Sequence, residues 1–198
     1  TLTLLKEVGI KNEFQGNVIQ VKPYTHQSST KTIFVATDWS SASYFYSFVA
    51  IGRKPITLKT FKKNSLQGDS VIEEMYAELF GIESIFDEKE HSISLIPKEN
   101  FEFPKTIEIN MNSCPDIAQT ICVTASALQI PFHIIGLATL KVKETDRLVA
   151  LQNELEKIGM KTEITEDSIT STEFIAPQEK ISIATYNDHR MPMCFAPH

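Results

Sequence analysis

The densest group of charged side chains lies between residues 141 and 147, which read KVKETDR. On a helix, Glu144 and Arg147 stand three residues apart and Lys143 and Arg147 four apart, which places the three side chains on neighbouring parts of one surface. An acid beside two cations can protonate a substrate or hold an anionic one. A charge run is also typical of a solvated helix start with a local ion pair, so this segment alone leaves both interpretations open.

A second group of ionisable residues occupies positions 188–190, which read Asp-His-Arg. The apolar residues that follow predict a helix starting here, so the group lies at the edge of a core. Partial removal from water shifts pKa values, which makes His189 and Arg190 candidate site residues. A histidine in such a place can equally be an ordinary surface or core residue.

Asp116 adds a candidate carboxylate at the start of another predicted helix. It follows Pro115, a residue favoured in the first turn, so the alternative is a simple N-cap. The three cysteines, Cys114, Cys122 and Cys194, have no metal-ligand spacing, and two of them fall in apolar helical runs. We therefore expect structural cysteines, no metal site and a reducing compartment.

The composition narrows the function further. A formal charge of −6 argues against a nucleic-acid-binding protein, because phosphate backbones require positive charge. The seven glycines form neither a dinucleotide nor a triphosphate loop, so phosphates would be bound by side chains and helix N-termini. No run approaches the roughly 18 apolar residues of a membrane span, and no secretory signal opens the chain, so we expect a cytoplasmic protein.

These candidate residues must be positioned by a repeated unit. Three glycines that end amphipathic helices, at 9, 81 and 159, are 72 and 78 residues apart. Three aspartates that open apolar helices, at 38, 116 and 188, are 78 and 72 residues apart. Each glycine is followed by two strands, and an extended segment separates the two helices. The pattern predicts an α/β (α+β) fold of repeated βαβαββ units of roughly 75 residues.

The units do not fit the ends of the 198-residue chain. Residues 1–37 read as the last helix and hairpin of a domain that is mostly absent, and residues 38–198 as a second domain that stops within its last unit. We expect the chain to be a fragment of a longer protein.

Together, five segments resemble the 5-enolpyruvylshikimate-3-phosphate (EPSP) synthase family. They are DWSSASYF at 38–45, NSLQGD at 64–69, PD at 115–116, KVKETDR at 141–147 and NDHRM at 187–191. They occur in the family's order, and the similarity runs through essentially the whole chain. The fold implied by the resemblance has two domains, each of three βαβαββ units around a pseudo-threefold axis.

The resemblance implies transfer of the enolpyruvyl group of phosphoenolpyruvate to the 5-hydroxyl of shikimate 3-phosphate, with release of phosphate. It implies no metal or other cofactor, and a monomer at full length. Asp116 would hold the attacking hydroxyl and be a candidate base, and Glu144 would protonate the methylene carbon beside the cationic Lys143. Arg147 and Arg190 would grip phosphoenolpyruvate. His189 would lie nearby, and Asp38 would stand at the domain crossover close to the site.

Some features differ from the family pattern. Thr139 stands where some members have Asn, and Pro192 falls where a helix should continue, so we expect a kinked or unwound segment there. Because half a cleft cannot enclose two substrates, the fragment alone should be inactive.

Two alternatives remain. A related transferase could act on a UDP-sugar, as UDP-N-acetylglucosamine enolpyruvyl transferase does. A non-catalytic or RNA-processing protein could reuse the same fold.

Overall fold

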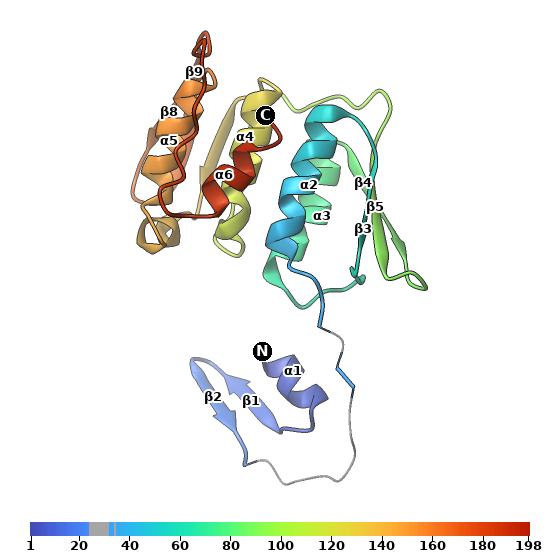
Figure 1. The fold of residues 1–198 in the computed structure, drawn as a ribbon. Coiled ribbons are helices and arrows are strands. Elements are labelled where there is room, and N and C mark those ends of the chain that lie inside the picture. The colour runs from blue at the N-terminus through green and yellow to red at the C-terminus, as the bar shows by residue number, and fades with distance from the viewer. Residues whose placement is uncertain (24–31, 34) are drawn as a thin grey trace. The chain divides into compact units, whose positions relative to one another are not determined.

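A computed structural model describes residues 1–23, 32–33 and 35–198. The chain divides into two compact units, Thr1–Val35 and Ala36–His198 (Figure 1). The boundary lies two residues before the 37/38 division expected from the sequence. Within the described residues, no helix has the length and apolar character needed to cross a membrane.

In its described residues, the first unit contains one helix and one hairpin. Helix α1 (Leu2–Glu7) is followed by the antiparallel strands β1 (Asn12–Gln15) and β2 (Val18–Val21). The Asn12 side chain donates hydrogen bonds to the carbonyls of Leu2 and Ile10, which ties the helix to the hairpin. The predicted helix, glycine and pair of strands are therefore present here.

The second unit contains the predicted repeat, and one copy of it is complete. That copy runs β6 (Ile107–Asn110), α4 (Ala118–Ala127), β7 (Phe132–Ile135), α5 (Arg147–Lys157), β8 (Met160–Ile164) and β9 (Ser168–Phe174). Its sheet has the order β6-β7-β9-β8, with β6 and β7 parallel and the other pairs antiparallel. The parallel pair is joined by α4, as a βαβ crossover requires.

The preceding copy consists of α2 (Trp39–Gly52), β3 (Ile56–Lys59), α3 (Ile72–Leu79), β4 (Ile82–Asp87) and β5 (Ser92–Pro97). Its antiparallel sheet has the order β3-β5-β4. Between β2 and α2, the described residues (22–23, 32–33 and 35–38) form no strand, so the opening strand of this copy is not seen. A third copy begins with α6 (Arg190–Phe195). The mixed helix-and-strand fold predicted from the repeat is confirmed.

The glycines of the repeat follow the ends of α1, α3 and α5, and all three have positive φ. At Gly159, φ is +99°, and a Cβ atom would stand 2.7 Å from the carbonyl oxygen of Ile175. Only a residue without a Cβ fits this turn without strain, which is why glycine ends the helix there.

The helices opened by the repeated aspartates pack together, with α4 in contact with both α2 and α6 (Figure 1). Hydroxyl groups link α2 to α4: Ser43 lies 2.9 Å from Thr120, and Thr124 donates to Ser47 at 2.7 Å. Paired hydroxyls let both helices bury polar faces without losing hydrogen bonds. The starts of α2, α4 and α6 are thereby fixed near one another.

The expected disruption at Pro192 is wrong. Helix α6 continues through it and ends at Phe195, before Pro197. Pro192 is the third residue of this helix, where no backbone N–H is needed for an intrahelical bond, so the ring is accommodated in the first turn.

Candidate active site

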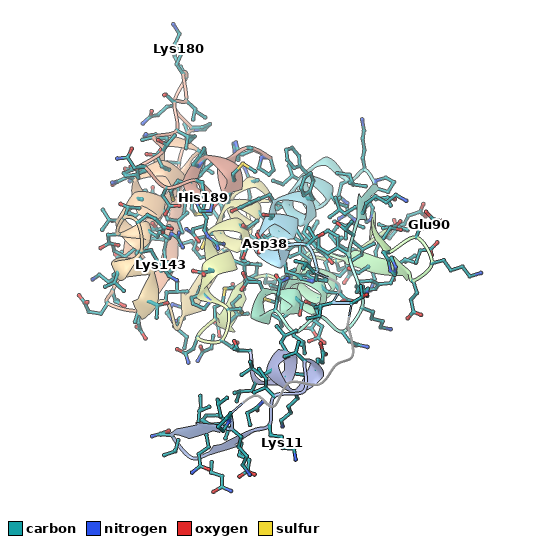
Figure 2. All side chains as sticks on the ribbon, turned by 60° about the horizontal axis from the view of Figure 1, so that its bottom comes forward. Lys11, Asp38, Glu90, Lys143, Lys180 and His189 are labelled. Carbon is teal, nitrogen blue, oxygen red and sulfur yellow. The ribbon has the colours of Figure 1, made fainter. Side chains whose placement is uncertain are left out.

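The candidate site residues come from three places in the second unit. Asp116 lies in the short 3-10 helix η2 (Pro115–Ile117), immediately before α4. Lys143 and Glu144 follow the 3-10 helix η3 (Ala138–Val142), and Arg147 is the first residue of α5. Arg190 is the first residue of α6. Figure 2 labels Lys143, His189 and Asp38 in this unit, with Glu90 far away in the turn between β4 and β5.

Three cations converge on the Asp116 carboxylate. Its Oδ1 lies 3.0 Å from Lys143 Nζ and 3.2 Å from Arg147 Nη1, and its Oδ2 lies 3.8 Å from Arg190 Nη2. Arg190 Nη1 also donates to the backbone carbonyl of Asp116 at 3.1 Å. The predicted carboxylate and the predicted cations are thus brought together. The arrangement can orient a hydroxyl group at the carboxylate and meet anionic groups with the cations.

Arg147 is the buried centre of the cluster, with 1% of its surface exposed. Its Nε donates to Asp188 Oδ2 at 2.6 Å, and its Nη2 donates to Glu144 Oε2 at 2.6 Å. With the Asp116 contact, one guanidinium binds three carboxylates. This planar, forked cation suits such a role better than lysine would.

The proximity of Lys143, Glu144 and Arg147 is confirmed, but the helical spacing proposed for it is wrong. Helix α5 begins only at Arg147, because Asp146 is its N-cap and accepts from the amides of Leu148 and Val149. Residues 143–146 precede the helix. Lys143 reaches Arg147 through their shared partner Asp116, rather than along a helix face.

Asp38 caps α2 and touches the cluster only indirectly. Its carboxylate accepts from the amides of Ser40 at 3.3 Å and Ser41 at 2.9 Å. Burial raises the pKa of Asp38, but hydrogen bonds from Ser41 and Ser40 and the charge of Arg190 outweigh it, so the pKa lies below its ordinary value. Asp38 therefore stays ionised and adds negative charge near Arg190.

Asp188 was predicted as a helix opener, but its role as the buried partner of Arg147 was missed. Its carboxylate also accepts from the Arg190 amide at 2.9 Å. Burial raises the pKa of Asp188, yet the hydrogen bonds from Arg147 and the Arg190 amide, with the charges of Arg147 and His189, bring it below the ordinary value. The sequence signal that could have indicated this role is that Asp188 occupies the same position in the repeat as Asp116.

Two further residues lie near the cluster: His189, which was predicted as a site residue, and Ser40, which was not. His189 is exposed, and none of the ion pairs in the part of the chain that the structure describes includes it. Ser40 was not predicted: its Oγ accepts from Arg190 Nη2 at 3.4 Å, and its hydroxyl donates to Asp69. No sequence pattern pairs a serine at 40 with an arginine 150 residues later.

The family model of EPSP synthase (3-phosphoshikimate 1-carboxyvinyltransferase) matches residues 1–196. The chain belongs to the EPSP synthase family. Among curated relatives, a 3-phosphoshikimate 1-carboxyvinyltransferase of Bacteroides fragilis is 38% identical over 201 residues, covering 100% of this chain and 47% of the relative. A chloroplastic enzyme of that name from Petunia hybrida is 35% identical, covering 99% and 38%.

Solved structures of EPSP synthases share the fold. A structure of EPSP synthase from Acinetobacter baumannii matches with a TM-score of 0.66 and 21% identity, covering 98% of this chain and 46% of that chain. The chain thus spans about half the length of the curated EPSP synthases it matches. The cluster around Asp116 consists of residues from the segments on which the resemblance to this family was based.

Proposed function

We propose that this chain supplies one half of an enzyme that transfers the enolpyruvyl group of phosphoenolpyruvate to the 5-hydroxyl of shikimate 3-phosphate and releases phosphate. The observation that carries the proposal is the convergence of Lys143, Arg147 and Arg190 on Asp116. Membership of the EPSP synthase family supports this acceptor over a UDP-sugar and over an RNA-processing role.

In the proposed reaction, Asp116 accepts a hydrogen bond from the 5-hydroxyl and serves as its base. The hydroxyl oxygen bonds to C2 of phosphoenolpyruvate while Glu144 gives a proton to C3, which forms a tetrahedral intermediate. Glu144, now a carboxylate, then takes a proton back from C3 as the bond from C2 to the phosphate oxygen breaks, and Asp116 passes the hydroxyl proton to the departing phosphate. The hydroxyl proton leaves with the phosphate, so the products are the enol ether and hydrogen phosphate.

The cations would hold the phosphate and the carboxylate of phosphoenolpyruvate. The Lys143 and Arg190 side chains are 31% and 17% exposed, whereas that of Arg147 is 2% exposed. Lys143 and Arg190 can therefore contact an arriving anion directly. Arg147 would contribute its charge to the anion while holding Asp116 and Glu144 in place.

The remaining expectations for the whole protein belong to the same proposal. The full-length protein would be a cytoplasmic monomer that binds its two substrates with the residues of both domains and needs no metal or other cofactor. The names of the Petunia hybrida and Arabidopsis thaliana relatives describe those enzymes as chloroplastic.

A replacement chimera tests the proposal. In it, this chain replaces the matching segment of the Bacteroides fragilis enzyme, and phosphate release is measured with phosphoenolpyruvate and shikimate 3-phosphate. We expect release by the chimera, none by the chain alone, and none when UDP-N-acetylglucosamine is the acceptor.

Glu144→Gln in the chimera should lower kcat by about 100-fold or more, since one acid–base group contributes about 10²–10⁴-fold. Lys161→Gln, in an exposed ion pair with Glu173, is the control. Turnover by the isolated chain would refute its inactivity, and an unchanged rate in the Glu144 variant would refute the assigned role.

A further inference from the structure

Glu154 is a buried carboxylate outside the Asp116 cluster, with 0% of its surface exposed. It lies on α5, seven residues or two turns after Arg147, so both side chains leave the same side of the helix. Lys157 Nζ contacts both of its oxygens, at 2.8 and 2.7 Å. A buried carboxylate is stable only with such partners, and the proposed reaction uses neither residue.

The other partners of Glu154 all belong to the segment that leads into α6. Tyr186 Oη donates to Glu154 Oε1 at 2.7 Å, and the Ala184 amide donates to Oε2 at 3.2 Å. Lys157 Nζ also donates to the carbonyl of Ser182 at 3.0 Å. Residues 175–187 contain no helix or strand, so these bonds fix a stretch that no sheet or helix holds.

The segment needs such support, because Tyr186 and Asn187 both have φ of +54°. Two consecutive residues with Cβ atoms in the left-handed region persist only when their surroundings hold them there. This double turn directly precedes Asp188, whose carboxylate binds Arg147 at 2.6 Å and whose neighbour Arg190 reaches Asp116. Helix α5 therefore binds this segment at two places, through hydrogen bonds of Glu154 and of Arg147.

We propose that Glu154 is a positioning residue for the candidate site. Through Tyr186 and the Ala184 amide it holds the left-handed turn that places Asp188 against Arg147 and Arg190 against Asp116. Glu154 contacts no reacting group and acts only through this segment. The consequence for ligand binding rests on the proposed function, whereas the consequence for the position of Asp188 does not.

Tyr186→Phe in the 198-residue chain tests the proposal, because it removes one hydroxyl and leaves the Glu154–Lys157 pair intact. Tyr46→Phe is the matched control: Tyr46 is buried, and its Oη lies 2.6 Å from Ser84 Oγ, on the other sheet. Hydrogen exchange of the Asp188 and Arg190 amides should quicken about ten- to hundredfold in Tyr186→Phe only, given the strength of hydrogen bonds to charged groups.

The Arg147 Nε–H resonance gives a second readout, since this proton faces Asp188 across a 2.6 Å contact. It should move upfield in Tyr186→Phe and stay in place in Tyr46→Phe. Glu154→Gln should act in the same direction and more strongly; if it does not fold, Tyr186→Phe still decides. Unchanged exchange together with an unchanged Arg147 resonance in Tyr186→Phe would overturn the proposal.

Phosphoenolpyruvate is then titrated into the same proteins. If the wild-type chain binds it, Tyr186→Phe should weaken binding about tenfold, and equal affinity would overturn a role in placing Arg190. If the wild-type chain does not bind it, which the need for both domains allows, exchange and the Arg147 resonance decide the role of Glu154, and phosphate release by the chimera tests the proposed function separately.

Discussion

Replacing Arg147 with Met should destabilise the second unit more than the loss of any other charged side chain in the site. Arg147 lies at 2% side-chain exposure against Asp188 at 0%, so this pair is out of contact with water. Met fills a similar volume without a charge. The Asp188 carboxylate would lose its Arg147 hydrogen bonds and, among the hydrogen bonds of the described residues, keep that from the Arg190 amide.

The magnitude follows from which contacts are buried. Breaking a buried ion pair by removing one partner costs about 3–5 kcal/mol, because the other charge stays uncompensated. The contacts to Asp116 and Glu144, whose side chains are 30% and 49% exposed, add little. We therefore expect a loss of about 3–5 kcal/mol. Arg147→Met combined with Asp188→Asn should cost less than the two single changes together, since the pair is then removed as a unit.

Urea unfolding followed by tryptophan fluorescence measures this loss. The chain has one tryptophan, Trp39, and it is buried at 1% exposure in the second unit. With a slope of about 2 kcal/mol per molar urea, the midpoint should fall by about 1.5–2.5 M. Lys161→Met, which breaks the exposed pair with Glu173, should change stability by less than about 1 kcal/mol. A similarly small loss for Arg147→Met would refute the buried-pair argument.

The same pair fixes the sign of the acid response. Because the pKa of Asp188 is below the ordinary 3.8, its contribution to stability is present above that value and is lost as the pH falls through the folded-state pKa. Wild-type stability should therefore drop below about pH 4 more steeply than that of Arg147→Met combined with Asp188→Asn. Parallel acid curves for the two proteins would contradict this assignment.

Two further predictions concern packing away from the charges. Gly159→Ala should cost about 1–3 kcal/mol in the same urea assay, because of its positive φ and the Ile175 carbonyl, whereas Gly52→Ala, with open space around its Cβ, should be neutral or stabilising. Burial raises the thiol pKa values of Cys122 and Cys194, so Ellman's reagent should label them only when the chain unfolds; rapid labelling of either in the native chain would argue against the packing of α4 and α6.

The repeat was predictable because the residues that mark its helix ends are set by local backbone geometry. A glycine with positive φ after a helix and an aspartate before one are each set by the backbone within a few residues, so their spacing revealed the units. The Arg147–Glu144 pair was predictable for the same reason. The predicted helical start at 143 failed because Asp146 caps α5, and a cap competes with helix continuation in a way that charge spacing does not reveal.

The contacts that were missed join residues far apart in the chain. Asp188 meets Arg147 across 41 positions, Tyr186 meets Glu154 across 32, and Ser40 meets Arg190 across 150. Each of these hydrogen bonds depends on how α2, α5 and α6 pack against the rest of the unit. That packing cannot be predicted from the sequence of any one segment. A buried glutamate such as Glu154 reads in the sequence as one more polar residue on the outer face of an amphipathic helix.

The burial of Arg147 bears on how an acidic chain would form the proposed site for anions. Three carboxylates, Asp116, Glu144 and Asp188, face three cations, Lys143, Arg147 and Arg190, so the cluster is close to neutral within a chain of net charge −6. In the proposed function, an arriving anion would compete with Asp116 for Lys143 and Arg190, while Arg147 would stay with the fully buried Asp188. Binding would then require the anion to replace the partly exposed Asp116 carboxylate. Breaking that contact costs little, because a partly solvated ion pair is weak, so no surplus of positive charge is needed.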